Sequence, residues 1–208
     1  MNLPDMRTIV RRDLHDEDTV NYRWTDDEIN RHILHALKEF SEAIPLEQKA
    51  TIATTSGFRE INISALTNRV MVAAVEYPVG LFPAVYQRFA LWGDEITLLG
   101  EDVPDGSNCN VYYGKIHTLD VSTSTIPAPY EDIVAAGAVG YASLEWAAYA
   151  TNRVNAGGDN TMSEFTELGK VRLDYFRAEL KRLSHRNRVR VTTLYRPGGE
   201  NSSQTTVE

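Results

Sequence analysis

The chain has 208 residues, a formal net charge of −8 and one cysteine, Cys109, which excludes an internal disulfide framework and a cysteine-based zinc site. The charge is unevenly distributed: residues 1–169 hold 12 Lys/Arg and 25 Asp/Glu (−13), whereas residues 170–208 hold 9 Lys/Arg and 4 Asp/Glu (+5). An acidic body with a basic end indicates an acidic partner for that end, either nucleic acid or a protein surface.

Residues 1–49 are predicted to form N-terminal helices. Residues 5–14 place their apolar side chains on one side, as in a short helix. A longer helix is expected over residues 25–44, because Thr25 and Glu28 have the spacing of a capping box and Pro45 follows its end. Its apolar residues recur at helical spacing, which predicts one buried face.

A polar stripe on this second helix has the spacing of metal ligands. Glu28, His32, His35 and Glu39 are separated by four, three and four residues. At about 100° per residue they lie roughly 80–140° from the centre of the apolar face, on its edge and outside. A metal site in a bundle takes further inward ligands from other helices, typically in Glu-x-x-His pairs, and the chain has no Glu-x-x-His. We therefore expect a polar flank, solvated or touching another subunit, and predict no metal and no cofactor.

Residues 50–126 have the features of an inserted β region. About six short segments rich in β-branched residues are separated by turn signals. One hairpin is expected around Gly57, between residues 50–56 and 58–64, and another around the dipeptide Gly93-Asp94. The pattern predicts an antiparallel sheet or a small sandwich.

Residues 127–184 return to helical periodicity. The segment from about 130 to 151 is apolar on every side and rich in Ala and Gly, which predicts a buried central helix with close neighbours rather than a membrane span. Glu145 is its only charge after the first turn, and we expect it to find a polar partner. Thr161 and Glu164 form a second capping box, which should open a helix that ends near Ser184.

Residues 185–208 are predicted to be a basic, extended C-terminal tail. Val189 and Val191 alternate with arginines, as in a strand with one apolar and one basic side. Such a segment has too little apolar area to fold alone, so we expect it to order on binding a partner. The polar residues that follow are expected to be disordered.

The sequence contains no catalytic motif. It has no Walker-type phosphate loop, no GxGxxG and no GxSxG. Cys109 lies in DGSNCN without an obvious activating base, and the tryptophans are not interleaved with Lys or Arg as in a nucleic-acid platform. These absences predict a structural or binding protein rather than an enzyme.

The order of the segments resembles that of the head-tail connector, or adaptor, proteins of tailed bacteriophages and prophages. The stretches that carry the resemblance are NYRWTDDEINRHILHALKEFSEAIP, then EYPVG with YQRFALWGDEITLL and NVYYGKIHTL, then IPAPYEDIVAAGAVGYASLEWAAYATNRVNAGG, and RNRVRVTTLY. They cover most of residues 5–196, and their order is more specific than any one of them. The order of the predicted segments gives an α+β fold in which a helical bundle from both chain ends holds an inserted antiparallel sheet or small sandwich. Some phage adaptors have only the helical part, so the resemblance implies a version with an elaborated β region.

The resemblance implies a structural virion protein at the head-tail interface, assembled in the host cytoplasm. Its copies would form a ring of twelve beneath the portal protein, extend the channel through which DNA passes without specific binding, and dock the tail or a neck protein below. We expect no membrane partner. The stripe Glu28, His32, His35 and Glu39 would then be an inter-subunit flank. The implied portal-binding residues are Arg186, Arg188, Val189, Arg190, Val191, Leu194, Tyr195 and Arg196.

Three alternatives remain open. The chain could be another neck or tail-completion protein that binds a different ring. It could be a metal-dependent hydrolase that uses the Glu28–Glu39 stripe. It could also be a nucleic-acid-binding module that uses Arg186, Arg188 and Arg190.

Overall fold

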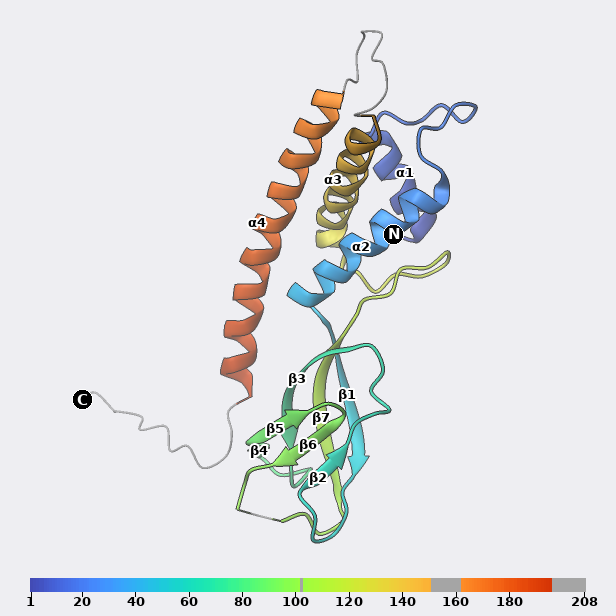
Figure 1. The fold of residues 1–208 in the computed structure, drawn as a ribbon. Coiled ribbons are helices and arrows are strands. Elements are labelled where there is room, and N and C mark those ends of the chain that lie inside the picture. Colours follow the sequence, from blue (N-terminus) through green and yellow to red (C-terminus); the bar gives the residue numbers. More distant parts are fainter. Residues whose placement is uncertain (102, 151–161, 196–208) are drawn as a thin grey trace, which may run out of the picture. The chain divides into compact units, whose positions relative to one another are not determined.

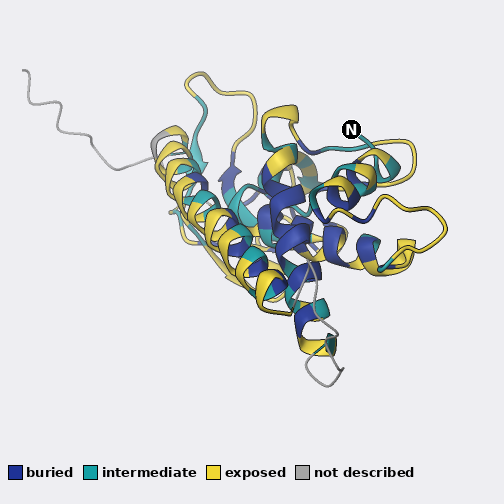
Figure 2. Ribbon diagram, turned by 90° about the horizontal axis from the view of Figure 1, so that it is seen from above, coloured by how far each residue is buried: buried dark blue, intermediate teal, exposed yellow. Residues whose placement is uncertain are grey.

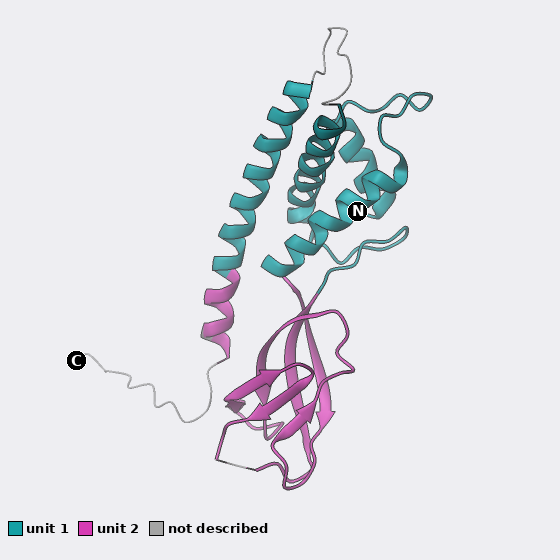
Figure 3. Cartoon of the chain, viewed as in Figure 1, with its two compact units in different colours: residues 1–44, 116–186 teal, residues 45–115, 187–208 magenta. Residues whose placement is uncertain are grey.

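The computed structural model describes residues 1–101, 103–150 and 162–195, and its fold is α+β, as the sequence predicts. Helices come from both ends of the chain, with two small antiparallel sheets between them in the sequence (Figure 1). The chain divides into two compact units (Figure 3). The helical unit comprises residues 1–44 and 116–186, and the β unit comprises residues 45–115 and the chain from residue 187 onward.

The helical unit contains α1 (Leu3–Asp13), α2 (Asp26–Ala43), the short 3-10 helix η1 (Ala128–Tyr130), α3 (Glu131–Ala150) and most of α4 (Met162–Leu194). The predicted capping box of α2 is confirmed: the Thr25 backbone N–H donates to Glu28 (2.7 Å), and the Glu28 N–H donates to the Thr25 hydroxyl (3.3 Å). These bonds satisfy backbone donors that a helix start otherwise leaves unpaired. Thr161, the predicted cap of α4, lies outside the described residues.

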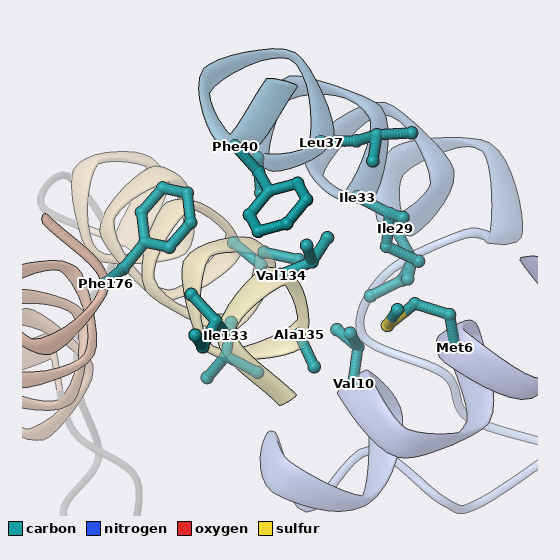
Figure 4. Packing of buried hydrophobic residues seen from close by; sticks show 14 of the residues in the cluster. Met6, Val10, Ile29, Ile33, Leu37, Phe40, Ile133, Val134, Ala135 and Phe176 are labelled. Atoms are coloured by element: carbon teal, nitrogen blue, oxygen red, sulfur yellow. The ribbon is translucent and has the colours of Figure 1, made fainter. Parts of the chain in front are cut away.

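Helix α3 is the centre of this unit's core. All residues from Ile133 to Gly140 are buried, which confirms the prediction of a central helix (Figure 2). Side chains of α1, α2 and α4 surround it; they include Met6, Ile33, Phe40 and Phe176 (Figure 4). None of the described helices has the length and apolar character that crossing a membrane requires.

Two glycines on α3 allow this close packing. A Cβ atom at Gly137 would lie 3.0 Å from the Cβ of Ala36 on α2 and 3.0 Å from the ring of Phe176 on α4. A Cβ at Gly140 would lie 2.6 Å from Cγ of Leu173. The small residues are therefore required by contact with neighbouring helices, which outweighs the lower helix propensity of glycine.

A buried arginine fixes the segment between α1 and α2. The Arg11 guanidinium donates to Asp16 (2.6 Å), to Asp26 (2.8 Å) and to the Trp24 carbonyl (2.9 Å). Asp16 in turn accepts from the backbone N–H of Arg23 (2.7 Å). Arg11 and Asp16 are only 5 and 6% exposed, so this network replaces the water that both charges lose on burial.

The described residues of the β unit form seven strands: β1 (Leu46–Ala53), β2 (Glu60–Asn62), β3 (Arg69–Glu76), β4 (Tyr86–Gln87), β5 (Phe89–Trp92), β6 (Glu95–Leu98) and β7 (Asn108–Lys115). They form one sheet in the order β1-β7-β3-β4 and another in the order β2-β6-β5, and every pairing is antiparallel. Their buried side chains, including Ile61, Val75, Ile96 and Val111, form a core of their own.

One of the two predicted hairpins is confirmed and the other is wrong. Strands β5 and β6 pair around Gly93-Asp94 as expected, and Gly93 has the positive φ that such a turn requires. The segments on either side of Gly57 do not pair with each other. Strand β1 pairs along its whole length with β7, and β2 pairs with β6. All eight residues of β1 pair with β7, which makes a longer ladder than the expected local hairpin would form.

Candidate functional site

The stripe on α2 is a polar edge between two helices of the same chain. Glu28 completes the capping box of α2, whose N-cap is Thr25. The Nε2 atom of His32 lies 2.6 Å from Glu145 on α3. His35 and Glu39 both contact Tyr141 of α3: the His35 ring stacks edge-on against it at 4.4 Å, and the Tyr141 hydroxyl donates to Glu39 at 2.6 Å. Burial and this hydrogen bond raise the pKa of Tyr141 to about 12.

The side chain of His32 is more buried than the sequence predicts. The sequence places it on the edge or outside, whereas the side chain is 8% exposed and is covered by α3. Burial lowers the pKa of His32, because the charged imidazolium loses water there. Its short contact with Glu145 lacks hydrogen-bond geometry. The imidazole is therefore held by packing at the edge of the helix and not by an ion pair.

Glu145 has the polar partner that the sequence predicts. Arg31 of α2 donates to both of its carboxylate oxygens, at 2.5 and 2.6 Å. This hydrogen bond lowers the pKa of Glu145, so the carboxylate stays charged at neutral pH. With Glu28 and Glu145 engaged in this way, the stripe has no free set of converging ligands. Among the described residues, no group of three His, Cys, Asp or Glu side chains is placed to hold a metal ion.

Cys109 and His117, a buried thiol and a buried imidazole outside the stripe, both lie among core side chains. Cys109 is fully buried on β7, and burial raises the pKa of its thiol, which favours the unreactive protonated form. His117 is also buried, and its ring lies between the carbonyl oxygens of Ile44 (3.1 Å) and Thr125 (2.8 Å). Both residues have the surroundings of core side chains.

The predicted extended tail is wrong between residues 185 and 194, because α4 continues to Leu194. The chain has no Gly or Pro between Gly169 and Pro197, and adding residues to an existing helix costs far less than starting one. The alternation of two valines with arginines is too short to favour a strand over continuation of the helix. Arg196 and the polar residues after it lie outside the described residues.

The helix separates the predicted portal-binding residues into two groups. Arg186 and Arg188 are exposed and form no ion pair with any described residue, and Val189 and Leu194 are each 54% exposed. Asn187, Val191 and Tyr195 are half-buried and line one groove. A spacing of four residues puts these three side chains on one side of the helix.

The groove belongs to the β unit. Its sheet side includes Glu47 of β1, Met71 and Ala73 of β3, and Tyr112 of β7. Glu47 also forms an ion pair with Arg190, which additionally contacts Asn187 at 2.9 Å. Both charged side chains of this pair are about half exposed, so it contributes only about 0.2–1 kcal/mol.

Tyr195 completes a cluster of three tyrosines. Its ring centroid lies 5.2 Å from the ring centroids of Tyr86 and Tyr112. The ring planes of Tyr195 and Tyr86 are nearly perpendicular. The Tyr112 hydroxyl donates to Glu76 (2.7 Å), which also accepts from Asn110 (3.0 Å). Burial raises the pKa of both Tyr112 and Tyr195, so these hydroxyls remain protonated. The sequence gives no signal for this cluster, because its members are separated by tens of residues.

No model of a known protein family matches the chain, and no curated protein matches it.

Proposed function

We propose that the chain is a structural virion protein of a tailed phage: a head-tail adaptor whose copies form a ring beneath the portal. The observation that carries the proposal is the chain order of the fold. Helices from both chain ends share one core, and antiparallel sheets lie between them in the sequence, which is consistent with the order of segments on which the resemblance rests. The resemblance and the fold are consistent with each other, and neither depends on a catalytic residue.

The distribution of charge supports the same role. The segment from Lys181 to Arg190 carries five Lys or Arg and no acidic residue. Its exposed arginines provide a cationic surface on α4 that suits an acidic protein partner. Residues 1–169, at −13, would repel DNA phosphates, which suits a channel wall that DNA must pass without binding.

The test uses purified portal rings of the same phage and a pull-down read by gel and by electron microscopy. The full chain should bind them as a ring. A chain ending at Ser184 should fold and fail to bind, while a matched chain ending at Arg196, which removes only the polar end, should bind fully. Full binding by the chain that ends at Ser184 would remove the proposed role of the α4 end.

A point substitution tests the charge itself. Arg188→Glu should weaken portal binding, because Arg188 is exposed and its charge is not paired with any residue that the structure describes. Lys170→Glu makes the same change of charge at an exposed position earlier on α4 and should have little effect. Tight, salt-sensitive binding of the full chain to free DNA would instead favour a nucleic-acid-binding module.

A further inference from the structure

The end of α4 uses the same side chains for two purposes. Val191 and Tyr195 are two of the four apolar or aromatic members of the predicted partner-binding segment, and both line the groove of the chain's own β unit, whereas Val189 and Leu194 are exposed. Arg190 is engaged as well, through Glu47 of β1. A partner that requires these three side chains has to compete with the sheet for them.

The contact with the sheet is weak compared with the rest of the helix. Within the helical unit, α4 is anchored by Phe165, Leu173, Phe176 and Leu183, none of which is more than 3% exposed. From residue 187 to 195 no side chain that the structure describes is buried. The only described ion pair of that segment is the exposed one between Arg190 and Glu47. The end of α4 can therefore leave the sheet without disturbing either core.

We propose that residues 187–195 form a reversible latch, docked on the β1–β7–β3 face in the free chain and released when the chain binds its partner. Release uncovers Val191 and Tyr195 beside the arginines, so the segment offers an apolar side and a cationic side together. This inference rests on the proposed function for the identity of the partner, an acidic surface of the portal. The latch itself depends only on contacts within the β unit.

A latch of this kind lowers the apparent affinity for the partner, because only the released fraction of molecules is competent to bind. Glu47→Gln removes the partner of Arg190 from the sheet and leaves the binding segment unchanged. It should raise portal affinity about two- to threefold, the effect of losing one exposed ion pair. Gln48→Glu is a control on the same strand that changes charge in the opposite direction, and it should not raise affinity.

A covalent lock tests release directly. In the double variant Glu47→Cys/Arg190→Cys, a short bis-maleimide joins the two thiols across the groove, while native Cys109 is fully buried. The locked protein should bind portal rings at least tenfold more weakly than the same variant treated with a monofunctional maleimide. Equal binding by the locked and unlocked forms would overturn the inference and leave the proposed function standing.

Amide hydrogen exchange tests the latch without any portal. Amides of residues 187–195 should exchange much faster than those of residues 165–183, and faster again in Glu47→Gln. Protection of the two segments to the same degree would overturn the latch whatever the partner is. Rapid exchange at residues 187–195, combined with no portal binding by the wild-type chain, would instead refute the proposed function and with it the release on binding.

Discussion

Replacing Gly137 with leucine tests the packing of the helical unit. A Cβ at this position would lie 3.0 Å from the Cβ of Ala36 and 3.0 Å from two ring carbons of Phe176. Ala36 and Phe176 are both 0% exposed, so neither can move toward solvent to make room. Leucine adds three further carbons beyond the Cβ, which have to enter the same space between α2, α3 and α4.

The expected loss follows from two opposing effects. Overpacking a filled core costs roughly 1–3 kcal/mol. Leucine regains up to about 0.8 kcal/mol because it has a higher helix propensity than glycine. The difference leaves the protein less stable by up to about 2 kcal/mol, which corresponds to a fall in Tm of up to about 8 °C.

Thermal unfolding followed by circular dichroism at 222 nm measures this change. Ala178→Leu is the matched control, since Ala178 is exposed on α4 and leucine there meets no buried neighbour. Gly137→Ala should fall between the control and Gly137→Leu, because it adds the Cβ alone. A Tm for Gly137→Leu equal to that of the control would show that this side of α3 is not packed, and the reasoning would be refuted.

Three further predictions concern charges. Arg11→Ala should destabilise the chain by roughly 3–5 kcal/mol in chemical denaturation, because it leaves Asp16 buried without its partner; a loss below 1 kcal/mol would mean that the network is solvated. Burial holds the pKa of His32 below its ordinary value of about 6.5. Below that pH the unfolded chain therefore binds more protons at this residue than the folded chain does. The free energy of unfolding should fall as the pH drops from 7 to 5. His32→Gln should make that pH dependence shallower, and an unchanged slope would count against it. Elemental analysis of the purified protein should find no stoichiometric zinc, iron or manganese, whereas a bound metal lost in His32→Ala/His35→Ala would revive the hydrolase alternative.

The elements that the sequence predicts correctly are those with local signals. Helix α2 has its cap and its terminating proline within the segment itself, and α3 shows its burial through composition alone. The β5–β6 hairpin is found because its turn chemistry lies between the two strands that it joins. In these cases the interaction that defines the element joins residues close in sequence.

The errors arise where distant residues decide the outcome. Strand β1 pairs with β7 across more than fifty residues, and no local pattern favours that partner over the nearer β2. His32 lies at the edge of its own helix, and only α3 makes that edge buried. The strand-like alternation near Val189 is overridden because it continues a helix that is already formed.

The continuity of α4 has a consequence for how this protein can change in evolution. Leu183, in the core of the helical unit, is followed at intervals of four by Asn187, Val191 and Tyr195 in the groove. Because each residue advances a helix by about 100°, inserting or deleting one residue after Leu183 would turn the groove-lining side chains by that angle relative to the buried side of the same helix. After an insertion, Arg186 and Arg190 would take the places of Asn187 and Val191 in the groove, with the composition almost unchanged. Length changes at this point are thus restricted to steps near whole helical turns, three or four residues at a time, while a change of residue type on the exposed side meets no such restriction.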